Sequence, residues 1–313
     1  MIFSERSEKI EVYKEEEGLD VMTQHKQRRL RQNLTGYAFV GPQLLFFAVF
    51  TIYPIFEGLR LSLYKSTAVE NTFVGMQNYI NLFQDPVFIR AMLNTLFLVV
   101  VITLGNLLLG LLISLAIYDK KPGYVSFVRS TFYLPVIVST VVMAMVWKFL
   151  LNPANGLVNY YLGKATGKTV NLLRNANTVL WVIAFVTIVA SVGTSIIMYI
   201  ASINGISTEM LEAAKVDGAS KLRVCTKIII PLVRPTTLYL SVTTIISILK
   251  LFVIIQLLSD GGPNNASMTM MYYLYRNAFF YNKMYVASAV GMVMFALAVI
   301  IAIPQFISMR KEG

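Results

Sequence analysis

The segment 212–235, EAAKVDGASKLRVCTKIIIPLVRP, decides how the rest of the chain is interpreted. It holds two acidic residues, five basic residues, one glycine and two prolines. On both sides lie apolar runs long enough to cross a bilayer, since about 20 apolar residues in a helix span the hydrocarbon core. The sequence therefore predicts a charged, interrupted helical element between two membrane spans.

The composition argues against an ordinary soluble domain. Of the 313 residues, 56% are hydrophobic and only 14% are charged, whereas about a quarter of a soluble domain is charged. One cysteine, Cys225, excludes an intrachain disulfide, and one histidine, His25, argues against a catalytic triad or a histidine metal site. We therefore expect neither a catalytic residue nor a metal ligand.

Six apolar segments are long enough to span a bilayer. None alternates polar and apolar residues as a barrel strand does, and a backbone in lipid must satisfy its own hydrogen bonds, so each is expected to be a helix. The sequence predicts an all-α integral membrane protein with six transmembrane helices. The segments are 38–62, 93–117, 130–151, 178–201, 236–258 and 286–308.

The basic residues orient these spans. If both termini are cytoplasmic, 17 Lys and Arg side chains lie on the cytoplasmic side and eight on the other. Cytoplasmic loops carry the excess of Lys and Arg, so both termini are predicted to be cytoplasmic. This bias accounts for the formal net charge of +11, and no nucleic-acid partner is expected.

The loops are too short to form a separate soluble domain. Met22 offers a second candidate start, so the presence of residues 1–21 in the native protein stays open. The predicted organisation is a cytoplasmic tail (1–36), a first transmembrane helix with its outer loop (37–92), a transmembrane core (93–308) and a second cytoplasmic tail (309–313).

The chain has no recognisable ATP-binding motif. The stretch GKATGKT at 163–169 has three residues between its glycines, where a phosphate loop has four, and it falls in a predicted outer loop. We interpret it as a turn. The spans also lack the buried acids of many ion-coupled carriers. These two absences suggest that the energy source lies on another subunit.

The charged segment is predicted to begin with a short helix that ends sharply. Ser207 caps its start, and Glu209 and Glu212 lie where the helix dipole favours negative charge. Asp217 and Gly218 end it, because Gly accepts the left-handed conformation that closes helices. Its apolar side is predicted to consist of Met210, Leu211 and Ala214.

A second short helix is predicted from about Ala219 towards Ile228. Pro231 and Pro235 then redirect the chain into the next span. From the residues alone, two readings stay open. The element is either a rigid, bent unit on the cytoplasmic surface or an interfacial linker lying on lipid headgroups.

The segment 212–235 resembles the EAA loop of binding-protein-dependent ABC importer permeases. The resemblance implies a coupling helix that sits in a groove of a separate cytoplasmic ATPase subunit, with Glu212 meeting a basic residue and Gly218 giving the turn. Its spacing is far more specific than a lone glycine motif. The matching residues are Glu212, Ala213, Ala214, Asp217, Gly218, Ala219, Ile228, Pro231, Leu232 and Pro235.

Three further stretches resemble carbohydrate-type permeases related to the maltose system. Ser259 departs from the usual Thr, and Val253 stands where Asp is frequent, so no role is carried over to position 253. The matches cover nearly the whole chain after residue 36. They are FVGMQNYINLFQDPVF (73–88) followed by Asn94-Thr95, VWKFLLNPANGLVN (146–159) and LKLFVIIQLLSDGGPNNASM (249–268).

The resemblance implies a permease subunit with type I ABC importer architecture, not an enzyme, in the inner (plasma) membrane of a bacterium. It would translocate a sugar or oligosaccharide delivered by an extracytoplasmic sugar-binding protein. The implied partners are a second related permease, two ATPase subunits or one ATPase homodimer, and membrane lipid. This chain would bind no cofactor, since ATP and Mg would lie on the ATPase subunits. The sequence does not identify the sugar.

The substrate pathway is predicted from polar residues within the spans, because such residues face the bundle interior. Thr243, Ser247 and Lys250 share one helix face. Lys250 would lie about 13 Å from the outer end of its span, so a pathway role and a structural role both stay open for it. For each hydroxyl, the alternative is helix packing or a bond to its own backbone. The candidate pathway residues are Asn106, Trp147, Ser195, Thr243, Ser247, Lys250 and Tyr272.

The run Gly261-Gly262-Pro263 is predicted to shape a turn on the outer side. Gly permits unusual backbone angles, and Pro fixes the exit direction. Contact with the binding protein and a purely structural role both stay open for this outer turn.

Other functions also stay open. A permease of the same type could import glycerol 3-phosphate or another polyol derivative, although Lys250 is then the single well-placed base. An ion-coupled secondary transporter would need no ATPase, but it leaves 212–235 unexplained. A membrane-embedded enzyme is disfavoured because the chain shows no clustered acids, bases or metal ligands.

Overall fold

The computed structural model describes residues 37–66, 71–167 and 169–310. The expected N-terminal tail lies outside the described residues. The chain divides into two units, with the boundary after Gly58. The first unit contributes most of a 26-residue helix, Tyr37–Ser62, which is apolar enough to cross a membrane. It contains a wider turn, η1 (Ala48–Ile52), and continues as α2 (Tyr53–Ser62).

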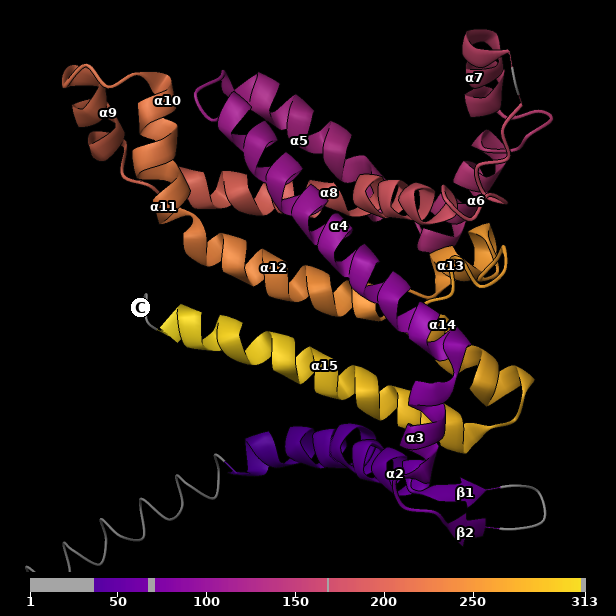
Figure 1. The fold of residues 1–313 in the computed structure, drawn as a ribbon. Helices are drawn as coiled ribbons and strands as arrows, with labels where there is room; N and C mark the ends of the chain where they lie inside the picture. Colours follow the sequence, from indigo (N-terminus) through magenta and orange to yellow (C-terminus); the bar gives the residue numbers. More distant parts are fainter. Residues whose placement is uncertain (1–36, 67–70, 168, 311–313) are drawn as a thin grey trace, which may run out of the picture. The chain divides into compact units, whose positions relative to one another are not determined.

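Long apolar helices make up most of the second unit. They are α4 (Pro86–Ile117), α5 (Pro122–Ile137), α8 (Val179–Asn204), α12 (Arg234–Leu249) and α15 (Met284–Arg310). α4 packs mainly on α8, α5 lies along α8, and α12 contacts both α4 and α15 (Figure 1). In the described chain, four helices are long and apolar enough to cross a membrane, or up to six if each of two bent helix pairs is one span.

Short elements connect these helices. They are β1 (Tyr64–Ser66), β2 (Asn71–Phe73), α3 (Gln77–Gln84), α6 (Thr140–Leu150), α7 (Leu157–Thr166), α9 (Thr208–Val216), α10 (Lys221–Val224), η2 (Cys225–Ile229), α11 (Ile230–Leu232), α13 (Val253–Leu258), α14 (Met270–Tyr275) and η3 (Arg276–Phe280). β1 and β2 form an antiparallel hairpin that pairs Tyr64 with Phe73. Within the second unit, α9 and α10 lie at one end of the long helices, and α13 and α14 lie at the other (Figure 1).

α4 begins earlier than the second predicted span, which started at residue 93. The Asp85 side chain caps it, with Oδ1 accepting a hydrogen bond from the Val87 N–H at 2.8 Å. Pro86 occupies the first helical position, where a missing N–H costs nothing. A hydropathy reading omits this start because its residues are not all apolar. The expected boundary between residues 92 and 93 falls inside α4.

The third predicted span, 130–151, is wrong as a single helix. α5 and α6 meet at an angle of 96°, and Val138 between them is extended. Pro135 lies inside α5, and its missing N–H weakens the last turn before the break. Hydropathy does not register the bend, because the residues on both sides of it are apolar.

The fifth predicted span, 236–258, ends early. α12 stops at Leu249, and the separate α13 begins at Val253. Ile254 and Ile255 are buried within the protein, so their apolar character reflects a protein core and not lipid. Lys250 lies exposed directly after the last residue of α12 and not inside a continuous helix that extends to residue 258.

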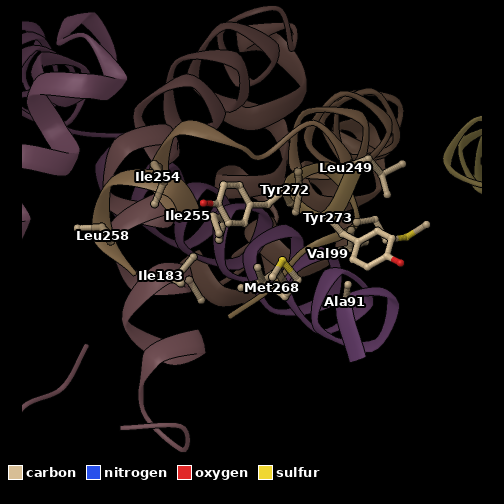
Figure 2. Packing of buried hydrophobic residues seen from close by; sticks show 14 of the residues in the cluster. Ala91, Val99, Ile183, Leu249, Ile254, Ile255, Leu258, Met268, Tyr272 and Tyr273 are labelled. Atoms are coloured by element: carbon tan, nitrogen blue, oxygen red, sulfur yellow. The ribbon is translucent and has the colours of Figure 1, made fainter. Parts of the chain in front are cut away.

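The core of the second unit lies where α4, α8, α13 and α14 meet. Ile183, Ile255 and Tyr272 pack there at close range (Figure 2). α5 approaches α8 most closely at Gly193, where an added Cβ would collide with the backbone of Phe132. Membrane helices often pack through such small residues, because lipid supplies no hydrophobic drive for association.

Candidate functional site

The charged segment forms the capped helix that the sequence predicts. At the start of α9, the Ser207 Oγ accepts a hydrogen bond from the Met210 N–H at 3.3 Å. At its end Gly218 has a φ of +74°. The N–H of Gly218 and that of the next residue donate to the carbonyls of Lys215 and Ala214, each at 3.0 Å. These two bonds form a Schellman motif, so α9 has a defined end and a defined exit direction.

α9 has one packed face and one exposed face. Leu211 and Ala214 pack against a buried cluster from α8, α10, η2 and α12. Met210 does not join them as expected, because it is 48% exposed, and Val216 is 88% exposed. The exposed face therefore combines apolar side chains with a carboxylate. The exposed members of the matching set are Glu212, Ala213, Asp217, Gly218, Pro231, Leu232 and Pro235.

α10 is tied to the end of α4. The Lys221 Nζ donates to the Asp119 Oδ1 at 2.9 Å and lies 5.3 Å from the centre of the Tyr118 ring. The hydrogen bond from Lys221 holds the pKa of Asp119 below its usual value of 3.8. The helix continues from α10 to Leu232 and bends by 61° into α12. A movement of α9 would therefore reach α12 through packed structure.

A cavity of about 260 Å³, lined by both polar and aliphatic residues, lies between α4, α8 and α12. Four of the seven predicted pathway residues line it, namely Asn106, Ser195, Thr243 and Ser247. None of the described residues that line it is charged. We call it the central cavity. Its polar lining consists of Asn106, Thr187, Ser191, Thr194, Ser195, Thr243, Thr244 and Ser247.

Four of the seven hydroxyl groups that line the central cavity donate within the protein, namely those of Thr187, Ser191, Thr243 and Ser247. Ser191 donates to the Thr187 carbonyl at 2.7 Å, and Ser247 donates to the Thr243 carbonyl at 2.8 Å. The Asn106 Nδ2 donates to the Ser191 Oγ at 2.9 Å and so links α4 to α8. Bonding to the helix's own backbone, left open from the sequence, is thus present. What these hydroxyls offer a ligand is their oxygen lone pairs, which accept hydrogen bonds.

Trp147, Lys250 and Tyr272 do not line the central cavity. Trp147 packs edge-on against Phe185. Tyr272 is only 2% exposed, and its hydroxyl donates to Asp260. A role for these three residues in the pathway stays a prediction.

The outer turn, Gly261-Gly262-Pro263, packs closely on α14. Gly261 has a φ of +76°, and a Cβ there would lie 3.0 Å from Met268 and 3.1 Å from Tyr272. The Ser267 Oγ donates to the Gly262 carbonyl at 2.6 Å. Gly261 of the outer turn therefore packs against buried core residues, which supports a structural role for the turn.

Sequence reasoning missed the residues that hold the segment after this turn. The Asn94 Nδ2 donates to the carbonyls of Ala266 and Met268 at 3.0 and 2.9 Å. The Thr95 Oγ1 accepts from the Met270 N–H at 2.9 Å. The signal was present, because Asn94 and Thr95 are adjacent polar residues in a mostly apolar helix and follow one of the matching stretches, but the sequence assigned them no role.

A larger hollow of about 700 Å³ lies beside the outer turn, with Lys148, Arg174 and Asp260 among its lining residues. The Lys148 Nζ donates to the Leu257 carbonyl at 2.9 Å and holds α6 to α13. This outer hollow lies at the end of the second unit that is opposite α9 (Figure 1).

Within the described residues, no three His, Cys, Asp or Glu side chains gather as a metal site requires.

The sequence is similar to those of known transport proteins. Residues 106–309 match the family described as "Binding-protein-dependent transport system inner membrane component". The chain is 34% identical over 290 residues to the probable ABC transporter permease protein YurN of Bacillus subtilis (strain 168), covering 90% of this chain and 99% of that protein. It is 28% identical over 279 residues to the sn-glycerol-3-phosphate transport system permease protein UgpA of Salmonella typhimurium, covering 88% of this chain and 94% of that one.

Two solved structures share the fold. One is a bacterial ABC transporter involved in the import of the acidic polysaccharide alginate, with a TM-score of 0.80 and 27% identity over 91% of this chain and 98% of the other. The second is a bacterial alginate ABC transporter in complex with an alginate pentasaccharide-bound periplasmic protein, with a TM-score of 0.79 and 27% identity over 89% and 94% of the two chains. The chain therefore belongs to the family of inner membrane components of binding-protein-dependent transport systems, as a multi-pass ABC importer permease and not an enzyme.

Proposed function

We propose that this chain is the permease subunit of an ATP-driven importer for a sugar or oligosaccharide delivered by an extracytoplasmic binding protein. The observation that carries the proposal is the central cavity, whose wall on α12 continues through α11 and α10 to the exposed helix α9. Its hydroxyl and amide groups match the hydroxyls of a sugar. An uncompensated charge is costly to desolvate, so a cavity without charged lining residues suits a neutral solute.

The similar proteins support a carbohydrate-type solute. The solved relatives import alginate, one of them in complex with a pentasaccharide-bound periplasmic protein. Because alginate is an acidic polysaccharide, they support a carbohydrate without favouring a neutral one. UgpA is described as a permease for sn-glycerol-3-phosphate. An anionic solute is the second candidate, and the presence of Lys148 and Arg174 in the outer hollow favours it.

The exposed face of α9 is the proposed contact with an ATPase subunit. Val216 lies one turn after Glu212 and offers an exposed apolar side chain beside that carboxylate, a combination that gives an interface both anchoring area and charge specificity. The complete importer would contain a second related permease and two ATPase subunits, or one ATPase homodimer. ATP and Mg would lie on the ATPase subunits.

The proposed topology has six spans with both termini in the cytoplasm of a bacterium. The helices of the described chain and the two bent pairs allow up to six spans. The excess of Lys and Arg places α9 and α10 on the cytoplasmic side. An ATPase would meet the exposed face of α9 there.

The substitution Glu212→Lys tests the proposed contact. It should abolish binding-protein-dependent uptake, because it places a cation opposite the expected basic residue of the ATPase, while the amount of protein in the membrane stays the same. Lys164→Glu, a charge reversal at the exposed end of α7, should transport normally. Normal uptake by Glu212→Lys would contradict the contact. Uptake that survives ATP depletion but needs an ion gradient would instead indicate a secondary carrier.

A second experiment separates the two solute classes. Proteoliposomes that contain the complete importer are offered radiolabelled neutral oligosaccharides or glycerol 3-phosphate, each with the cognate binding protein. We expect ATP-dependent accumulation of a neutral oligosaccharide. Accumulation of glycerol 3-phosphate alone would replace the first candidate with the second.

A further inference from the structure

A separate hollow of about 310 Å³ lies at the end of the second unit that carries α9 and α10. It is formed where α4 ends, α5 begins and α8 ends. It shares no lining residue with the central cavity. We call it the basic hollow, and none of the sequence motifs discussed above explains it.

Each of the three helices turns one face towards the basic hollow. Ile117 from α4, and Ile200 and Ile203 from α8, are buried and form an apolar floor. Lys120, Ser126 and Arg129 lie at an exposed rim. Ser126 and Arg129 are three residues apart and therefore project from the same side of α5. The hollow is thus amphipathic, with cations above and aliphatic side chains below.

Neither rim cation makes a hydrogen bond or a close ion pair with another described residue. Lys120 interacts with the Asp119 carboxylate only through weaker electrostatic attraction. The nearby carboxylate of Asp119 is already held by Lys221 at 2.9 Å. An Arg guanidinium, a Lys ammonium and a hydroxyl that line one hollow are groups suited to bind the oxygens of a phosphate.

We propose that the basic hollow binds the phosphate group of an anionic phospholipid. Lys120, Ser126 and Arg129 contact the phosphate, while the isoleucine floor receives the glycerol and the first acyl carbons. A lipid has apolar carbons next to its phosphate, so it matches a hollow with cations above an apolar floor better than a free phosphate ion does. Basic pockets between transmembrane helices on the cytoplasmic side are suited to anionic headgroups. The inference goes beyond the proposed function and rests on it only for the orientation of the helices.

The wild-type protein provides the first test. The full-length chain is placed in phosphatidylcholine nanodiscs that contain a small fraction of a photoactivatable phosphatidylglycerol. Cross-links should concentrate on residues 114–129 and 200–204, and unlabelled phosphatidylglycerol should block them. Cross-links without enrichment there would overturn the proposal. Blocking by inorganic phosphate as efficient as by phosphatidylglycerol would show that a soluble phosphate, not a lipid, is the ligand.

Variants then test the charges. Lys120→Gln combined with Arg129→Gln should lower the cross-linking yield roughly tenfold, whereas Lys120→Arg combined with Arg129→Lys should largely restore it. The matched control, Lys215→Gln with Lys227→Gln, removes two exposed bases at the same end of the molecule. An equal loss in the control would show only general surface attraction and would overturn the site. No step depends on uptake, so failure here is distinct from failure of the proposed function.

Discussion

Gly193 shows how one residue determines the distance between two helices. The backbone of α5 at Phe132 occupies the space where a side chain at position 193 would project. Gly218 serves a different purpose, because its left-handed backbone closes α9. Position 193 requires glycine because a neighbouring helix leaves no space for a side chain. Position 218 favours glycine because its backbone is left-handed.

We predict that Gly193→Ala destabilises the protein. The added methyl group must displace α5, and overpacking of this kind costs about 1–3 kcal/mol. Thermal unfolding of the purified protein in detergent measures the loss. Gly163→Ala in α7 is the control, because a Cβ there meets no atom within 4 Å and Ala favours a helix more than Gly does. Equal unfolding temperatures for the two variants would contradict the close approach.

The ion pair between Asp119 and Lys221 predicts a pH dependence. The folded-state pKa of Asp119 lies below 3.8, so the pair contributes stability above about pH 4 and loses it as the pH falls through that lowered pKa. Wild type should therefore exceed Asp119→Asn in stability at neutral pH by at most about 1 kcal/mol, because the pair is exposed and screened. The difference should vanish in acid. Unfolding curves at several pH values measure it, and a difference that grows in acid would refute this account.

At the scale of elements, the sequence predicts where a helix starts and ends when residues in its own turns determine this. It does not predict whether an apolar residue is buried in the protein core or faces lipid. The sequence predicts α9 because Ser207, Asp217 and Gly218 act within their own turn. It does not predict the separate α13, because Ile254 and Ile255 are as apolar in a protein core as they would be in lipid. The break between α5 and α6 was missed because the residues on both sides of it are apolar.

Asn106 on α4 provides the element-scale prediction. Asn106→Leu keeps a similar volume but removes the amide that bonds to Ser191 across the central cavity. We expect the uptake rate to fall roughly tenfold through lost hydrogen bonds to the solute. Thr131→Val is the control, since Thr131 is exposed on α5 and donates to its own helix. Unchanged uptake rate and solute affinity in the Asn106 variant would remove it from the pathway.

At the scale of the whole molecule, part of the site could be predicted from charge and polarity. Polar residues in separate spans were expected to face one interior, and Asn106, Ser195 and Thr243 do meet in the central cavity. Lys250 does not line the central cavity, because α12 ends at Leu249 and Lys250 lies after that end. Tertiary packing, and not the residue type, determines such an end.

The proposed orientation predicts which ends are accessible from outside. In a Cys225→Ala background, Lys283→Cys should react with a membrane-impermeant maleimide in right-side-out vesicles, since position 283 precedes α15 on the proposed outer side. Lys215→Cys on α9 should react only after permeabilisation. Both positions are exposed, so a reversed pattern would invert the topology.

The 61° bend before α12 also has a geometric consequence. At about 1.5 Å per residue, Ser247 lies about 21 Å along the helix from Val233, where the bend occurs. A swing of about 10° around that point would displace Ser247 by about 4 Å, more than the diameter of a water molecule, about 2.8 Å. Residues close to Val233 would hardly move. The central cavity would therefore change its width mainly at the Ser247 end. That end lies far from α9, the helix proposed to contact the ATPase subunit.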